Sequence, residues 1–157
     1  MASVFGRLFI KKIAAGVGKA VIGAALDKRK YKKEWEKREG IFNSYIREVK
    51  DEITDPEEIA ALQVFLTFPL DQTTEYSTKE FRKEVESGEF DDFELRRWKA
   101  YHKRLSGMTK NPKIMNGIAR CDAKIYLLET TQKLQQEPNL KERVFDHFYK
   151  LNQRMND

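Results

Sequence analysis

The stretch YKKEWEKREGIFNSYIREVKDEITDPEE, residues 31–58, decides what kind of fold this chain adopts. Its larger side chains recur at intervals of three or four residues: Tyr31, Trp35, Arg38, Phe42, Tyr45, Val49 and Ile53. Because this spacing places residues on one face of an α-helix, the pattern predicts an amphipathic helix over about residues 27–53. Gly40 lies inside it, and we expect a kink or a break there.

The end of the same stretch predicts the start of a second helix. Asp55 is a good N-cap, and Pro56 suits the first helical position. Glu58 would complete a capping box with Asp55. The apolar residues that follow keep a helical spacing until Pro69, and they are Ile59, Leu62, Phe65 and Leu66.

Two shorter helices are expected in the middle of the chain. Ser77 and Glu80 have the spacing of a capping box, and Gly88 marks the end of the helix that they open. Asp91 and Glu94 suggest another start, followed by an inner face of Leu95, Trp98, Tyr101 or His102, and Leu105. Gly107 would end this helix.

The last third of the sequence predicts two long helices. Asn111 and Pro112 open the first, whose expected inner stripe is Ile114, Ile118, Cys121, Ile125 and Leu128. Asn139 and Glu142 would cap the second, with the stripe Val144, Phe148, Leu151 and Met155. We find no alternating β pattern and no repeat. The sequence therefore predicts an all-α protein, with a compact bundle of five to seven helices over residues 27–157.

Composition and charge set further limits. The chain has 157 residues and a single cysteine, Cys121, so no internal disulfide can form. We expect a cytoplasmic or other reducing compartment. Residues 1–50 carry 13 basic and 5 acidic groups, residues 51–100 carry 6 and 14, and residues 101–157 carry 11 and 6. This asymmetry indicates either two different partner surfaces or charge pairing between segments of one fold.

Residues 1–26 differ from the rest of the chain. On a helical projection of residues 9–24, one face collects Phe9, Ile10, Ile13, Val17, Ala20, Val21 and Ala24. No acid occurs before Asp27, and half of the eight glycines lie in this segment. Such a helix would form poorly alone and better on a surface. We predict a cationic amphipathic N-terminal helix that acts as an arm.

Several motif assignments fail for this arm. A phosphate-binding loop needs Gly and Ser or Thr where Ile13 and Ala20 stand, and a dinucleotide fingerprint needs Gly where Val21 stands. Lys19 interrupts both a membrane span and the apolar region of a signal peptide. A presequence would contain more Ser and Arg. The small-residue strip Gly16, Ala20 and Ala24 instead allows close helix packing.

We assign no catalytic, cofactor-binding or metal site. Cys121 with His102 or His147 is the only candidate nucleophile and base, and each fits better as an amphipathic packing residue. One cysteine and two histidines do not supply a zinc site. The acidic residues between 84 and 94 lack the alternation of a calcium loop. We expect no cofactor and no small-molecule substrate.

The arm with its basic extension predicts attachment. An anionic membrane surface and other protein subunits of a larger assembly are nearly equal candidates as partners, and the two can coincide. The protein would then be a non-enzymatic structural or assembly subunit, peripheral to a membrane or within a large complex. The predicted apolar contacts are Phe5, Leu8, Phe9, Ile10, Ile13, Val17 and Val21. The predicted charged contacts are Arg7, Lys11, Lys12, Lys19, Lys28, Arg29, Lys30, Lys32 and Lys33.

Nucleic acid is the alternative partner. Residues 28–38 hold seven basic groups with Tyr31 and Trp35 between them, an arrangement that can contact phosphates and stack on bases. No helix-turn-helix, zinc-finger or RNA-binding signature accompanies it. Core packing also explains the two aromatic residues, so we rank this alternative below attachment.

Overall fold

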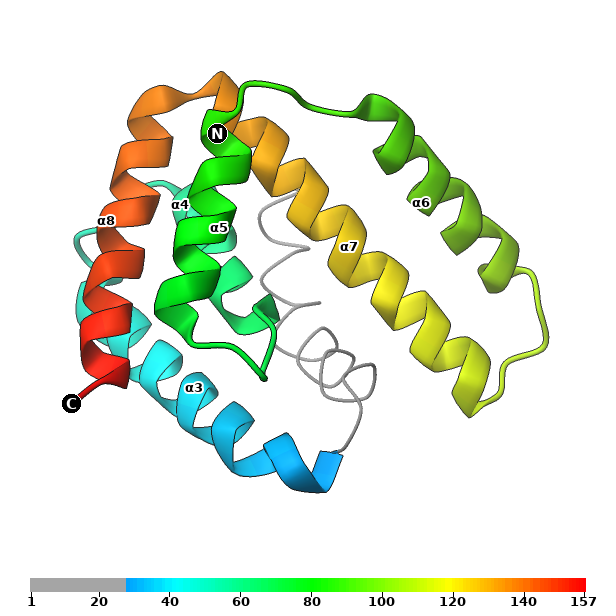
Figure 1. The fold of residues 1–157 in the computed structure, drawn as a ribbon, viewed down its shortest axis with the longest axis horizontal. Helices are drawn as coiled ribbons and strands as arrows, with labels where there is room; N and C mark the ends of the chain where they lie inside the picture. The colour runs from blue at the N-terminus through cyan, green and yellow to red at the C-terminus, as the bar shows by residue number, and fades with distance from the viewer. Residues whose placement is uncertain (1–27) are drawn as a thin grey trace.

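The structure, a computed structural model, describes residues 28–157 (Figure 1). These residues form six α-helices and a short 3-10 helix, η2, and contain no strand, which confirms the predicted all-α class. The elements are α3 (Lys28–Val49), α4 (Pro56–Leu62), η2 (Gln63–Thr67), α5 (Thr74–Glu86), α6 (Asp92–Ser106), α7 (Pro112–Gln136) and α8 (Pro138–Met155). The predicted arm, residues 1–26, lies outside the described part of the chain.

A cluster of phenylalanines forms the centre of the fold. Phe148 of α8 is fully buried, and its ring centroid lies 5.9 Å from that of Phe68 and 6.2 Å from that of Phe81. Phe65 of η2 lies 6.4 Å away, and Phe42 of α3 stacks on Phe65 at 6.3 Å. Edge-to-face and stacked aromatic pairs add to the gain from apolar burial. The cluster thus joins α3, η2, α5 and α8.

The first helix follows its predicted face closely. Trp35, Phe42 and Tyr45 are buried, as the spacing indicated. The predicted break at Gly40 is wrong, because α3 continues through this exposed glycine. The helix ends at Val49, before the predicted end at Ile53, and a turn over residues 50–52 still returns Ile53 to the core.

The buried face of α3 includes one charged residue, Arg38. Its guanidinium is fully buried and donates hydrogen bonds to the carbonyls of Phe68, at 2.5 Å, and Pro69, at 3.3 Å. Burial lowers the pKa of Arg38 to about 10, so the side chain stays charged at neutral pH. The fork of the guanidinium satisfies two carbonyls of the loop between η2 and α5. Arg38 therefore fixes this loop against α3.

Three of the predicted N-caps are confirmed. Asp55, Asp91 and Asn111 each accept a hydrogen bond from a backbone N–H in the first turn of their helix. The predicted box of Ser77 and Glu80 is wrong: α5 begins at Thr74, and Thr73 caps it by accepting from the Tyr76 N–H at 3.1 Å. The last helix also begins before its predicted cap, Asn139, with Pro138 in its first turn.

The long helix α7 packs against other helices on two of its faces. Toward the main core it buries Tyr126, Thr130 and Leu134, none of which belongs to the predicted stripe. In that stripe only Cys121 is fully buried, and the four others, Ile114, Ile118, Ile125 and Leu128, are half-buried. The packing partner of α6 is mainly α7. The predicted stripe was therefore incomplete, because α7 contacts the core and α6 at the same time.

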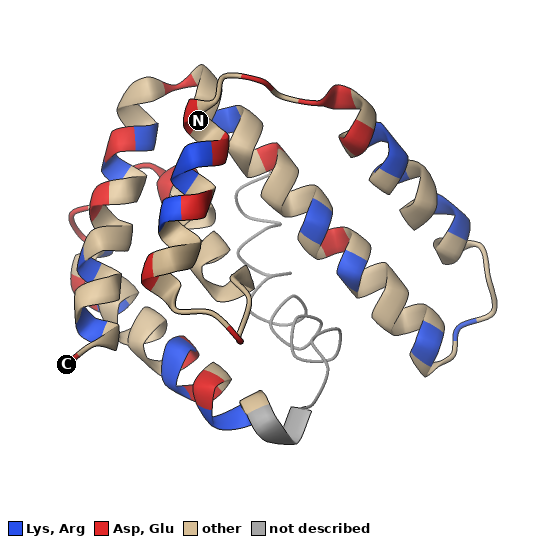
Figure 2. Cartoon of the chain, viewed as in Figure 1, with Lys and Arg blue, Asp and Glu red and all other residues tan. Residues whose placement is uncertain are grey.

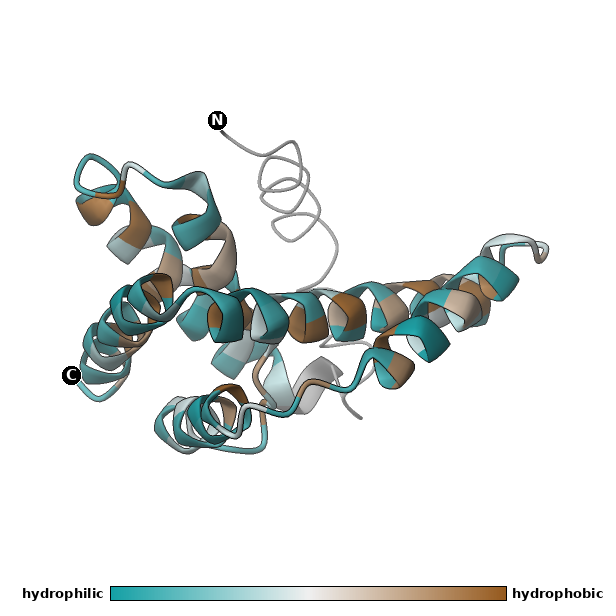
Figure 3. Ribbon diagram, turned by 90° about the horizontal axis from the view of Figure 1, so that it is seen from above, coloured by the Kyte–Doolittle hydropathy of each residue, from teal (hydrophilic) through white to brown (hydrophobic). Residues whose placement is uncertain are grey.

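The pair formed by α6 and α7 is set apart from the main core. The buried residues Leu95, Leu105 and Cys121 do not belong to the phenylalanine-centred cluster, to which α6 contributes no residue. A Cβ added to Gly117 of α7 would lie 3.0 Å from the Leu105 side chain of α6, so the glycine allows a close approach. The joined ends of α6 and α7 lie far from α8 (Figures 1 and 3).

Ion pairs connect the acidic middle of the chain to α7 and α8. Glu57 lies 2.8 Å from Lys133, and Glu86 of α5 lies 3.6 Å from Lys141. The nearly buried Glu58 lies 3.3 Å from Arg143, so its carboxylate faces α8 and not the helix start as a capping box requires. Of the two explanations for the charge asymmetry, pairing between segments accounts for these acids.

His147 lies at the same junction. Burial raises the pKa of Tyr45 to about 12, and its hydroxyl lies against Nδ1 of His147. Nε2 of His147 lies 3.6 Å from the Glu58 carboxylate. A neutral imidazole fits both neighbours, since Nδ1 accepts from Tyr45 and Nε2–H faces Glu58. Burial also lowers the pKa of His147 below its ordinary value of 6.5.

Replacement of Arg38 by Met will lower the free energy of unfolding by about 2 kcal/mol, since it removes the donor to the buried Phe68 carbonyl and to the part-buried Pro69 carbonyl. Urea denaturation measures the change. Arg47→Met on the exposed side of the same helix is the matched control and will change stability by less than about 0.5 kcal/mol. Equal stability of the two variants would contradict the role of Arg38.

Stability will fall as the pH drops from 7 to 5, in part through His147. Because its pKa is lower in the folded state, the unfolded chain takes up the proton first once the pH passes below about 6.5. Urea midpoints at several pH values measure this loss. His147→Gln keeps a donor and an acceptor but does not titrate, and it will show a smaller loss. Identical slopes for both proteins would exclude His147 as a contributor.

Candidate anion-binding surfaces

The predicted contact residues divide into three groups. Those of the arm lie outside the described residues: Phe5, Arg7, Leu8, Phe9, Ile10, Lys11, Lys12, Ile13, Val17, Lys19 and Val21. Lys28, Arg29 and Lys30 belong to the first turn of α3, but their side chains lie outside the described part. Lys32 and Lys33 are described, and both are exposed. The prediction for the arm itself therefore stays a prediction.

The start of α3 separates basic side chains from aromatic ones. Trp35 is buried in the core, and Tyr31 is half-buried against it. Lys32 and Lys33 face outward, and Lys32 makes only an exposed pair with Glu36 at 4.0 Å. Such a pair contributes little and leaves the ammonium available to other anions. This segment presents charge without exposed aromatic rings.

Two further basic residues of segment 28–38 serve the fold. Lys37 donates to the carbonyl of Met155 at 3.2 Å, and Arg38 donates to the loop before α5. Together with Tyr31 and Trp35, they were part of the pattern that suggested phosphate contact and base stacking. The structure thus places four members of that pattern in contacts within the helical domain.

A second basic surface lies where the sequence reasoning did not place one. Residues 96–124, here called the basic hairpin, include most of α6, the connecting loop and the first half of α7. They contain one acid, Asp122, and nine basic residues: Arg96, Arg97, Lys99, Lys103, Arg104, Lys110, Lys113, Arg120 and Lys124. All of the nine are exposed except Lys124, which is half-buried. Figure 2 shows these charges along both helices.

Few of these charges are neutralised within the described residues. Lys99 alone among the nine has a carboxylate partner there, Glu129 of α7, at 3.1 Å. The single acid, Asp122, lies 3.0 Å from Nε2 of His102. Both contacts join α6 to α7. The other basic residues of the hairpin, except the half-buried Lys124, face solvent, where a net charge of +8 over 29 residues attracts anions.

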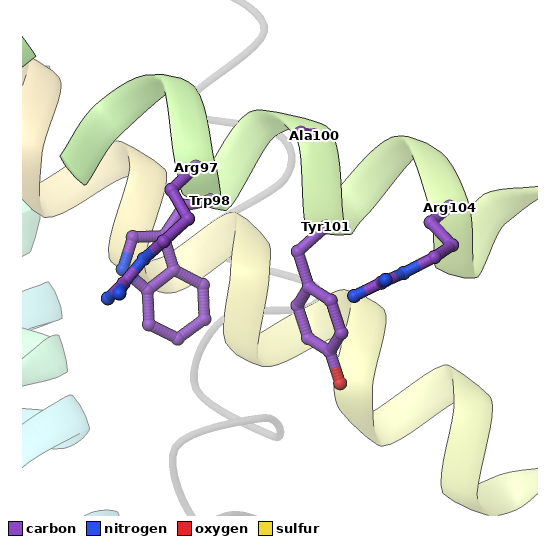
Figure 4. A pocket seen from close by; sticks show the side chains of 5 residues that line it. All are labelled: Arg97, Trp98, Ala100, Tyr101 and Arg104. Carbon is purple, nitrogen blue, oxygen red and sulfur yellow. The ribbon is translucent and has the colours of Figure 1, made fainter. Parts of the chain in front are cut away.

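One side of α6 combines arginines with aromatic rings. Arg97, Trp98, Ala100, Tyr101 and Arg104 line a hollow of about 580 Å³ (Figure 4). The Arg104 guanidinium carbon lies 5.1 Å from the centroid of the Tyr101 ring. The Trp98 ring meets Tyr101 edge to face, with centroids 6.2 Å apart. Tyr101 is 39% exposed, so its ring is accessible at this surface.

Sequence reasoning missed the basic hairpin because of where the charge was counted. A division at residue 100 joins Arg96, Arg97 and Lys99 to the six acids of residues 84–94, which outweigh them. A count by expected helix would have found the hairpin, since Gly107 and Asn111 already bounded its loop. Tyr101 was assigned to the inner face as an alternative to His102. The structure instead places His102 against α7 and leaves Tyr101 outside.

Both histidines that could serve as a base for Cys121 contact other side chains. Cys121 is fully buried, and burial raises the pKa of its thiol. His102 is paired with Asp122, and His147 lies between Tyr45 and Glu58. A nucleophilic thiol needs a lowered pKa and access to solvent. The interpretation of Cys121 as a small packing residue agrees with this environment.

A chain of Ser106, His102 and Asp122 has the composition of a hydrolytic triad. The Ser106 hydroxyl lies 3.5 Å from Nδ1 of His102, but it donates to the His102 carbonyl at 2.8 Å. Its proton is therefore directed at the backbone. The three residues lie near the carboxyl end of α6, whose carbonyls disfavour an oxyanion. The arrangement does not meet the requirements of an activated serine.

Residues 28–157 show neither a cluster of metal ligands nor a helix that could cross a membrane. These residues bring together no group of three or more His, Cys, Asp and Glu side chains that could hold a metal ion. The acidic run contributes the N-cap Asp91 and the ion-paired Glu86. None of the described helices combines the length and the apolar character that crossing a bilayer requires.

Comparison of the chain with protein-family models, with curated protein sequences and with solved structures found no match in any of the three.

Proposed function

We propose that this protein is a non-enzymatic attachment protein that holds its helical domain at an anionic membrane surface. The cationic amphipathic arm would lie in the interface, and the basic start of α3 would lie among the lipid head groups. The protein would be peripheral to the membrane. It could work there alone or as a subunit of an assembly.

The observation that carries the proposal is the orientation of side chains at the start of α3. Lys32 and Lys33 are exposed, whereas Trp35 is buried in the core. A basic patch next to an apolar helix supplies the two signals that stable peripheral binding needs. Each basic residue held near an anionic surface contributes about 1 kcal/mol.

The same orientation favours lipid over nucleic acid as the partner of this segment. Stacking on bases needs exposed aromatic rings, but the rings of this segment pack against the domain. Lys37 and Arg38 donate to carbonyls of the fold, which leaves fewer cations for phosphates. What remains outward is charge alone, which suits a surface of dispersed anionic head groups.

Replacement of both lysines, Lys32→Gln with Lys33→Gln, will weaken binding to anionic vesicles roughly 30-fold, the equivalent of about 2 kcal/mol. Sedimentation of the full chain with anionic and with neutral vesicles measures this. Arg47→Gln in the last turn of α3 with Lys50→Gln in the turn just after it removes the same charge from exposed positions and is the matched control. Binding will also weaken as salt is added.

Removal of residues 1–26 tests the arm in the same assay and will abolish sedimentation with anionic vesicles. The proposal fails if the full chain does not bind anionic vesicles. It also fails if the control pair of substitutions weakens binding as much as the Lys32 and Lys33 pair. Binding of equal strength to neutral vesicles would exclude a role for head-group charge.

A further inference from the structure

We infer that the hollow on α6 binds single-stranded nucleic acid, with an unpaired base on Tyr101 and the neighbouring phosphates on Arg97, Arg104 and other cations of the basic hairpin. This surface is separate from the start of α3 and does not depend on the proposed attachment function.

Charge complementarity identifies the occupant as a polyanion. Only Lys99 of the nine basic residues is paired with a carboxylate among residues 28–157. Phosphate groups of a nucleic acid strand supply closely spaced negative charges that such a row of cations neutralises. Residues 1–26 of this chain supply no such negative charge, because they carry Arg7, Lys11, Lys12 and Lys19 and no acid.

The aromatic rings indicate that the polyanion carries bases, which can stack on them. Proteins that bind single strands combine a basic groove with aromatic side chains on which bases stack. Here Tyr101 is exposed between Arg97 and Arg104 on one side of a single helix. This is the combination that the start of α3 lacks, since Trp35 there is buried in the core.

The contact between Arg104 and Tyr101 suggests how the base enters. The guanidinium lies over the ring at 5.1 Å, which protects one aromatic face in the free protein. An exposed cation–π contact is weaker than the stacking of a base on the same ring. A base can therefore take the place of Arg104, and the displaced guanidinium becomes available to a phosphate.

The composition of the same side of α6 argues against a lipid surface. A helix that inserts in a membrane interface needs a broad apolar face. Between Arg97 and Arg104 the apolar or aromatic residues that line the hollow are Trp98, Ala100 and Tyr101, of which Trp98 is half-buried. The next exposed large apolar side chain on α6 is Phe93 near its start. The two arginines would thus divide any apolar face that this side could offer.

Fluorescence anisotropy of a labelled oligothymidylate of about 16 nucleotides tests the inference. Tyr101→Ala in the full chain will weaken binding roughly tenfold, and Tyr101→Phe will bind like the wild type because it keeps the ring. Tyr149→Ala on α8 removes a tyrosine ring that is more exposed than that of Tyr101, and it is the control, with no expected change. Thermal melts will show that Tyr101→Ala remains folded, since the residue is exposed.

A second probe of the same length without bases separates stacking from charge. Tyr101→Ala will not change its binding, whereas Arg97→Gln with Arg104→Gln will weaken both probes and reduce the dependence on salt. Lys79→Gln with Lys83→Gln, on the exposed side of α5, controls for the loss of two charges.

Three results would overturn the inference. The first is equal affinity of Tyr101→Ala and Tyr149→Ala for the oligothymidylate. The second is an equal loss on the probe without bases, which would show a site for polyanions in general. The third is a loss of anionic-vesicle binding by Tyr101→Ala with no loss of oligonucleotide binding, which would assign the hollow to lipid. In the variant with Lys32→Gln and Lys33→Gln, which tests attachment, Tyr101→Ala will still weaken binding of the oligothymidylate.

Discussion

The buried ring of Phe148 is the constraint on which the rest of the fold depends. Its neighbours come from η2, from the loop after it, from α5 and from α8 itself. Phe42 and Trp35 bring α3 into the same cluster. The apolar faces of these helices are used there, so their outer faces are left to charged residues. Arg38 completes the arrangement from within, because its guanidinium holds the loop that carries Phe68.

The position of α6 follows from the burial of the other helices' apolar faces in the phenylalanine cluster. It contributes nothing to the phenylalanine cluster and packs mainly on the second face of α7, through Leu95, Leu105 and Cys121. The acids of the middle segment pair with α7 and α8, as Glu57 does with Lys133. The cations of the basic hairpin have no such partners, apart from Lys99, in residues 28–157. The fold therefore neutralises one end of the molecule and leaves a basic surface at the other.

Helical spacing and capping chemistry were enough to predict the all-α class and most helix boundaries. Asp55, Asp91 and Asn111 could be identified as N-caps because the requirement is local. Thr73 could not be chosen over Ser77 from sequence, since Ser77 is buried by a tertiary contact that spacing does not report. The second face of α7 was missed for the same reason: Tyr126 and Leu134 meet helices that are distant in sequence. The basic hairpin was predictable in principle, but only once charge is counted helix by helix.

We propose that the molecule binds two anionic ligands at two places, lipid at the start of α3 and a single strand on α6. Hydrogen–deuterium exchange of the full chain, alone and with each ligand, tests both places in one measurement. We expect slower exchange in the first turns of α3 with anionic vesicles, and slower exchange in α6 with oligothymidylate. Protection of the same segment by both ligands would contradict two separate surfaces, and no protection of α6 by oligothymidylate would contradict the assignment of the hollow.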